Sequence, residues 1–97
     1  MGQLFQLALS NRAEILALLK QFHATNPRLF GSVARGDDVA SSDIDLLVAM
    51  PKNISLLDVA RLELALCDLM GHKIDLVIED ELHPRIRDRV LGEARPL

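Results

Sequence analysis

The chain has 97 residues, of which 49% are hydrophobic and 26% are charged, and these values predict a single globular domain over residues 1–97. The net charge of −3 argues against nucleic acid as the main ligand, because phosphate backbones are bound by dense clusters of Lys and Arg. One cysteine excludes an intrachain disulfide, and apolar runs of about five residues are far shorter than the roughly 20 that span a bilayer.

Helical patterns come first in the chain. The segment Met1 to Leu9 is apolar and compatible with a short helix that docks on the domain. Asn11 and Glu14 have the spacing of an N-cap and its reciprocal partner, and the apolar residues that follow share one helical face. Asn26-Pro27 ends this second helix, because the residue before a proline avoids the helical region.

Strand patterns begin after this break. Leu29-Phe30 is a short strand candidate, and residues 31–42 are polar, contain glycine and are typical of a turn. Residues 43–50 alternate at first and then become fully apolar, as a central strand does. Residues 73–78 form a second strong strand candidate.

Helices are predicted between and after these strands. Ser55 has the position of an N-cap, residues 56–70 carry apolar side chains at helical spacing, and Gly71 is placed to end that helix. Pro84 opens a last helix through about Leu91, which Gly92 ends. The order α-β-turn-β-α-β-α predicts an α+β (mixed α/β) fold, in which helices pack on a small central mixed sheet.

Two carboxylates stand out in the first central strand. Asp43 and Asp45 flank Ile44, and because strand side chains alternate between faces, both carboxylates point the same way while Ile44 points into the core. Their Cα atoms are about 6.5 Å apart, so both can reach one or two shared cations. Strand interiors are depleted in aspartate, and the pair therefore favours a functional site over a solvated strand end.

A third carboxylate lies in the second strand. Asp75 stands between Ile74 and Leu76, and if the two strands pair, three carboxylates converge. Like charges about 4 Å apart repel by roughly 4 kcal/mol at an effective dielectric of 20, which a divalent cation or protonation must offset. Oxygen ligands with room for water and phosphate suit Mg²⁺. The alternative for Asp75 is an edge-strand charge that discourages aggregation.

A phosphate seat is predicted beside these carboxylates. Gly31 at a strand end lets backbone approach a ligand closely, and a helix that begins at Ser32 would offer free N–H groups and a hydroxyl to an anion. Arg35 lies one helical turn further on. It either faces the phosphates or pairs with a nearby aspartate such as Asp37 or Asp43, and its residue type serves both uses.

These residues together carry a family resemblance. The chain closely resembles the DNA polymerase beta-like nucleotidyltransferase superfamily, and within it the minimal nucleotidyltransferase group. The resemblance runs from about residue 28 to 77 and depends on three motifs: Gly31-Ser32-x-x-Arg35-Gly36, Ser42-Asp43-x-Asp45-Leu46 and the later Asp75.

The resemblance implies roles for the residues of these motifs. Gly31 and Ser32 would hold the β- and γ-phosphates of ATP, with Arg35 as a further nucleotide-binding residue. Asp43 and Asp45 would bind two Mg²⁺ ions, while Asp75 would complete one metal site and help to deprotonate the acceptor hydroxyl. The implied reaction is in-line attack on the α-phosphate, with pyrophosphate as the leaving group.

The resemblance also implies a partner. Many minimal members resemble antitoxins paired with a HEPN-domain ribonuclease toxin, and some transfer AMP to a tyrosine of that toxin. This implies a cytoplasmic antitoxin in a heteromeric complex, without direct contact to nucleic acid or membrane. Two alternatives stay open: an antitoxin that neutralises its toxin by binding alone, and a nucleotidyltransferase that acts on a small molecule.

Overall fold

Helices and strands alternate along the chain, and the computed structural model describes them for residues 2–97. In chain order the elements are α1 (Gln3–Ser10), α2 (Arg12–Gln21), β1 (Thr25–Phe30), α3 (Gly31–Arg35), β2 (Ile44–Ala49), α4 (Leu56–Met70), β3 (Ile74–Ile78), a 3-10 turn (Glu79–Glu81), α5 (Pro84–Glu93) and β4 (Arg95–Pro96). Among these described residues, no helix combines the length and the apolar character needed to cross a membrane.

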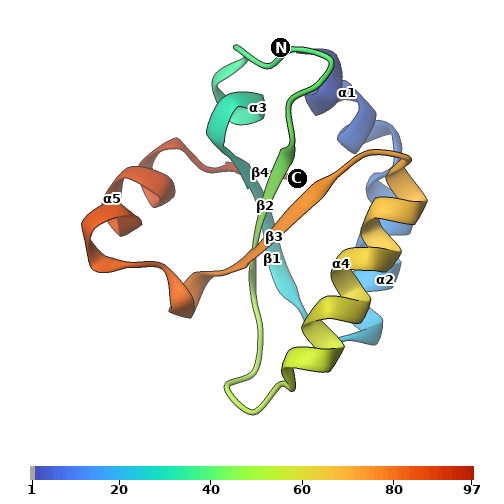
Figure 1. Cartoon of the computed structure of the whole chain (residues 1–97), viewed down its shortest axis with the longest axis vertical. Coiled ribbons are helices and arrows are strands. Elements are labelled where there is room, and N and C mark those ends of the chain that lie inside the picture. The colour runs from blue at the N-terminus through green and yellow to red at the C-terminus, as the bar shows by residue number, and fades with distance from the viewer. Residues whose placement is uncertain (1) are drawn as a thin grey trace.

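The four strands form one mixed sheet in the order β3-β2-β1-β4. β2 and β3 run parallel because α4 carries the chain back between them, whereas β1 is antiparallel to both β2 and β4. Helices α2 and α4 lie on one side of the sheet and α5 on the other (Figure 1). The mixed α+β architecture predicted from the sequence is confirmed.

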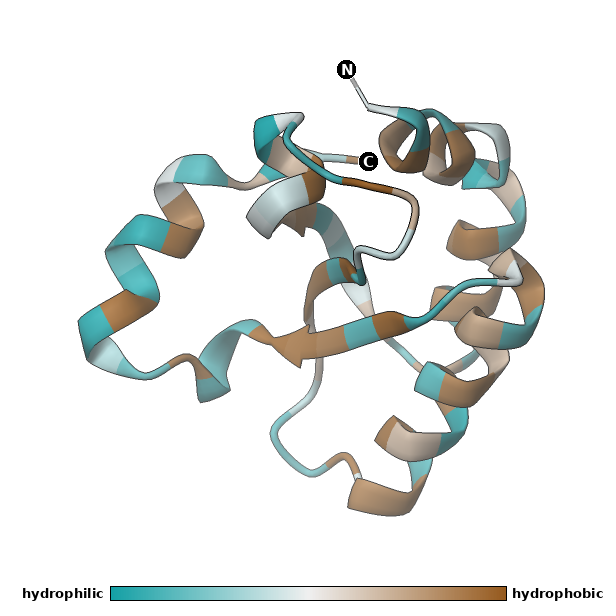
Figure 2. Ribbon diagram, turned by 45° about the horizontal axis from the view of Figure 1, so that its top comes forward, coloured by the Kyte–Doolittle hydropathy of each residue, from teal (hydrophilic) through white to brown (hydrophobic). Residues whose placement is uncertain are grey.

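The main core lies between the sheet and helices α1, α2 and α4. Alternate strand residues point into it, and the helices meet them with one apolar face each. Its most deeply buried members are Leu19, Leu29, Ile44, Val48, Leu62 and Leu66. The intervening strand residues, among them the aspartates, therefore face the other side of the sheet. Helix α5, which lies on that side, is largely hydrophilic, whereas the strands and α4 are mostly hydrophobic (Figure 2).

The central helix begins and ends as the sequence predicts. Ser55 Oγ accepts a hydrogen bond from the N–H of Asp58 at 3.1 Å, which satisfies one of the free donors of the first turn of α4. Gly71 follows the last turn with φ of +62°, the left-handed conformation that glycine adopts at little cost.

Three expectations about the other helix ends are wrong in whole or in part. Asn11 stands at the predicted N-cap position of α2, but its side chain does not cap that helix, because it donates to the carbonyl of Leu7 at 2.9 Å. The helix ends at Gln21, before the predicted proline stop, and Pro27 lies inside β1. Gly92 is a helical residue, since α5 continues to Glu93 and passes directly into β4.

β1 and β4 also differ from the prediction. β1 begins at Thr25, and an irregularity in its pairing with β2 accommodates Pro27, which has no N–H to donate. β4 has only two residues and pairs with β1 through Arg28 and Leu29. Of the expected first segment, Met1 lies outside the described residues, and the helix there begins at Gln3.

Candidate active site

Two of the predicted metal ligands face each other across the parallel strands. Asp45 of β2 is the register partner of Asp75 of β3. Side chains at matched positions of paired strands lie on the same face, so both carboxylates are on the face opposite the main core. Asp43 stands one residue before β2, two positions from Asp45, and shares that face.

The electrostatics of Asp45 reflect this crowding. Its pKa is raised from the ordinary 3.8 to about 6, first by partial burial and then by the charges of Asp75 and Asp43. Arg35 acts in the opposite direction and Glu93 adds a smaller repulsion, so both side chains also lie near enough to sense this carboxylate. A carboxylate of this kind gains from a bound cation, because the cation relieves the repulsion.

The glycine corner lies directly against Asp45. β1 ends at Phe30, the register partner of Asp45, and the next residue, Gly31, begins α3 with φ of +72°. A Cβ at Gly31 would collide with Asp45 Oδ2, so the corner needs glycine both for its backbone conformation and for the approach of the carboxylate. Ser32 follows in the first turn of α3, where backbone N–H groups have no partner within the helix.

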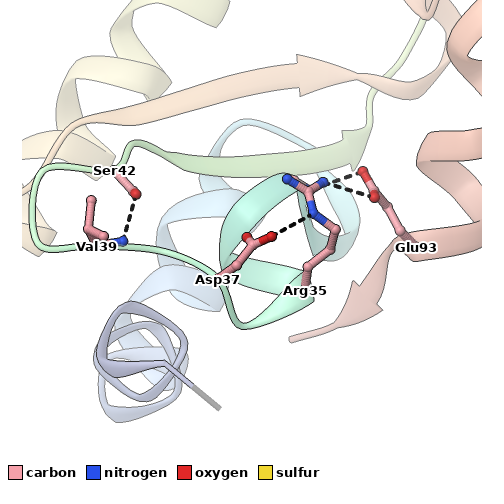
Figure 3. Close-up of polar contacts among 6 residues, drawn as sticks. Arg35, Asp37, Val39, Ser42 and Glu93 are labelled. Atoms are coloured by element: carbon pink, nitrogen blue, oxygen red, sulfur yellow. Dashed lines mark hydrogen bonds and ion pairs between the residues drawn. The ribbon is translucent and has the colours of Figure 1, made fainter.

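The Arg35 side chain is held by two carboxylates rather than left free. Its Nε donates to Asp37 Oδ2 at 3.3 Å, and its Nη1 donates to Glu93 Oε2 at 3.1 Å (Figure 3). The hydrogen bonds with Glu93 and then Asp37 raise the pKa of Arg35 above its ordinary value. Of the two uses open to this residue, the structure therefore shows carboxylate pairing, with Glu93 as a partner that the sequence pattern did not indicate.

The loop that leads into β2 is fixed at Ser42. Its Oγ accepts a hydrogen bond from the N–H of Val39 at 2.9 Å (Figure 3), and its carbonyl lies 2.6 Å from His72 Nε2. His72 directly follows Gly71, the residue that ends α4, so this contact ties the start of β2 to the start of β3. Both aspartate-bearing strands are therefore held at the same end.

The donor set fits a hard divalent cation, although it is not gathered in this conformation. Within residues 2–97, no three His, Cys, Asp or Glu side chains already lie close enough together to hold an ion. Asp43 pairs instead with Lys73, at 3.6 Å between Oδ2 and Nζ. Both side chains are substantially exposed, so the pair is weak and can exchange for a cation at little cost. Asp45 and Asp75 already face each other, with only oxygen atoms to offer, as Mg²⁺ prefers.

A mixed sheet that sets paired carboxylates beside a glycine corner is the architecture of a nucleotidyltransferase. The nucleotidyltransferase domain family matches residues 13–97, and the chain belongs to this family. The family predicted from the sequence motifs is confirmed, and with it the class of enzyme.

Known proteins similar to this chain support its place in the nucleotidyltransferase family. A Methanocaldococcus jannaschii protein assigned as a protein adenylyltransferase is 35% identical over 83 residues, which cover 86% of this chain and 89% of the relative. A solved structure of a protein assigned as a minimal nucleotidyltransferase has a TM-score of 0.85 and 45% identity, over 100% of this chain and 97% of that one. A toxin–antitoxin crystal structure with AMP-PNP has the same fold, with a TM-score of 0.76 at 23% identity, over 89% of this chain and 71% of that one.

Proposed function

We propose that this chain transfers AMP from ATP to a tyrosine hydroxyl of a HEPN-domain toxin and thereby acts as its antitoxin. The observation that carries the proposal is the Asp45–Asp75 pair, which lies in register beside a glycine corner that has no room for a side chain. Two facing carboxylates and a bare backbone corner suit a cation-bound triphosphate better than a neutral ligand.

Each residue has a distinct task in this proposal. Gly31 and Ser32 form the seat of the β- and γ-phosphates, Gly31 by leaving the corner free of a side chain and Ser32 through its backbone N–H and hydroxyl. Asp43 and Asp45 would hold Mg²⁺, and Asp75 would complete one metal site and help to deprotonate the acceptor hydroxyl. The acceptor oxygen forms a bond to the α-phosphorus as the bond to the bridging oxygen breaks, and pyrophosphate leaves. Bound Mg²⁺ would neutralise charge on the phosphates as the leaving group departs.

The choice of a protein acceptor rests on the similarity of this chain to known proteins. The M. jannaschii relative is assigned as a protein adenylyltransferase, and a structural neighbour is a toxin–antitoxin complex that contains a nucleotide.

The test uses the chain produced together with its candidate partner, the product of the adjacent gene. The partner's intact mass is measured with the wild-type chain, with Asp43→Ala plus Asp45→Ala, and with Asp68→Ala, an exposed aspartate on α4 that serves as control. We expect addition of AMP with the wild-type and control chains and none with the double variant. Peptide mapping then assigns the modified residue to a tyrosine.

Two other results would contradict the proposal in different ways. A partner that stays unmodified yet is bound and inhibited by the wild-type chain would indicate neutralisation by binding alone. Failure to bind, combined with nucleotide transfer to a small hydroxylated compound, would indicate a small-molecule transferase.

A further inference from the structure

Glu93 lies at the junction of three elements around the glycine corner. It is the last residue of α5, and the strand β4, which begins two residues later, pairs with β1 through Leu29 and Arg95. This pairing holds the end of α5 beside the end of β1, where α3 begins. The Glu93 side chain is only 20% exposed, so its carboxylate is directed into the protein rather than into solvent.

One carboxylate contacts both ends of α3. Glu93 Oε1 accepts a hydrogen bond from the N–H of Gly31 at 3.3 Å, and Oε2 accepts one from Arg35 Nη1 at 3.1 Å. Gly31 is the first and Arg35 the last residue of this five-residue helix, and Figure 3 shows the arginine reaching from α3 to Glu93 on α5. The bonds from Glu93 to these two residues are called the α3 clasp below.

α3 needs such support from outside. A helix of one turn and a half is unstable by itself, because nucleation fixes several residues for few hydrogen bonds. Its first residue is a glycine in the left-handed region, and glycine loses more backbone freedom on folding than any other residue. A charge-assisted bond at each end fixes the helix against β1 and keeps the Gly31 corner at Asp45.

We propose that Glu93 is a positioning residue of the nucleotide seat, the phosphate-binding corner at Gly31 and Ser32. It does not contact the nucleotide but holds that corner in place through its bonds to Gly31 and Arg35. The inference rests on the proposed function in so far as the seat holds ATP. Because Arg35 neutralises Glu93, the clasp adds no net charge beside the triphosphate. Removing Arg35 alone leaves the Glu93 carboxylate uncompensated beside the seat, so Arg35→Ala should bind Mg²⁺-ATP more weakly than the double alanine variant.

The experiment compares Glu93→Ala, Glu93→Gln, Arg35→Ala and the double alanine variant with the wild-type chain. Glu81→Ala, an exposed glutamate in the 3-10 turn, is the matched control. Two quantities are measured: hydrogen exchange of the Gly31 amide in the nucleotide-free chain, and the Kd for Mg²⁺-ATP. The first reports the clasp without any ligand, and the second reports the seat.

We expect Glu93→Ala to speed exchange of the Gly31 amide about tenfold and to weaken Mg²⁺-ATP binding by a similar factor. Glu93→Gln keeps a carbonyl acceptor for Gly31 but loses the charge that holds Arg35. It should therefore restore most of the amide protection while binding ATP about threefold more weakly than the wild type. The double variant should bind no more weakly than Glu93→Ala alone, and the control should match the wild type.

Unchanged Gly31 exchange in a folded Glu93→Ala variant would overturn the inference. Tighter Mg²⁺-ATP binding by Glu93→Gln would also overturn it, because Glu93 would then compete with the phosphates. If Glu93→Ala does not fold, the affinity of Glu93→Gln decides alone, and equal or tighter binding counts against the clasp. If the wild-type chain binds no Mg²⁺-ATP, the proposed function is overturned. Loss of Gly31 amide protection in Glu93→Ala would in that case still support the clasp.

Discussion

Asp45 and Asp75 occupy matched positions on adjacent parallel strands, on the sheet face opposite the main core. Neighbouring strands are about 4.8 Å apart, so the two carboxylates are held near each other by the backbone pairing itself. The fold thus imposes a repulsion between them, and the raised pKa of Asp45 reflects its partial burial first and this repulsion second. Sites that concentrate like charges in this way trade stability for function.

The raised pKa predicts an inverted pH dependence for Asp45. Because the pKa is about 6 in the folded chain and 3.8 ordinarily, the folded state binds more protons between these values, and stability falls as pH rises through this window. The shift corresponds to about 3 kcal/mol at most, and solvent screening of a half-buried group reduces it to about 1 kcal/mol.

We therefore expect Asp45→Asn to raise the melting temperature of the free chain by about 4–8 °C at pH 7.5. The gain should shrink as pH falls below 6 and vanish below about pH 3, where the wild-type carboxyl is protonated in both the folded and the unfolded state. Thermal denaturation by circular dichroism across this range measures it, with the exposed Asp68→Asn as control. A gain that is independent of pH would show that charge at Asp45 is not its cause.

The two glycines that flank α3 allow a matched comparison. Gly31 and Gly36 both have left-handed φ, of +72° and +79°, so an alanine at either costs about 1–2 kcal/mol in backbone strain. Only at Gly31 would the new Cβ collide with Asp45, since nothing lies within 4 Å of a Cβ at Gly36. We expect Gly31→Ala to be the more destabilising and to abolish Mg²⁺-ATP binding, while Gly36→Ala keeps it.

The collision can be separated from the strain by a second substitution. Asp45→Ala in the Gly31→Ala background removes the carboxylate that the new Cβ meets, so the loss caused by Gly31→Ala, measured against Asp45→Ala, should shrink to near that caused by Gly36→Ala. Chemical denaturation of the wild type, Gly31→Ala, Gly36→Ala, Asp45→Ala and the double variant supplies the comparison. No recovery would mean that backbone strain alone accounts for the loss.

Local signals made the central part of this fold predictable. Ser55 and Gly71 mark the two ends of α4 through chemistry that depends on a few neighbouring residues. The shared face of Asp43 and Asp45 follows from strand alternation, and their spacing after a glycine-serine turn indicated the nucleotidyltransferase family that the whole-chain comparison confirms. These features needed no knowledge of distant contacts.

Features set by tertiary contacts escaped prediction. β4 has two residues, too few for any periodicity, and it exists because β1 offers a free edge. Glu93 is an ordinary last-turn residue in the sequence and becomes part of the site only through that pairing. Asn11 is of a residue type that caps helices, but α1 runs directly into it and its backbone is not extended, with φ of −105° and ψ of 14°. Its side chain therefore makes no capping hydrogen bond to α2.

Lys73 is predicted to restrain Asp43 in the metal-free chain. Their 3.6 Å contact is between exposed groups, so Lys73→Gln should change the free energy of unfolding by less than about 1 kcal/mol. The same change frees Asp43 to bind a cation and should strengthen Mg²⁺-ATP binding about two- to fivefold at low ionic strength. Isothermal titration measures the affinity, with Lys52→Gln as a control outside the site. Weaker binding would instead assign Lys73 a direct role in holding the phosphates.

Binding of Mg²⁺-ATP should itself stabilise the fold. A ligand that binds only the folded state at a concentration of 100 times its Kd adds about 2.7 kcal/mol, which for a chain of this size raises the melting temperature by about 10 °C or more. We expect this rise in the wild-type chain and its loss in Asp43→Ala plus Asp45→Ala, which should start from a higher melting temperature because the repulsion is gone. Addition of EDTA should abolish the rise in the wild-type chain, since ATP without a cation would meet the unshielded carboxylates. An equal rise in the double variant would place the metal elsewhere on the molecule.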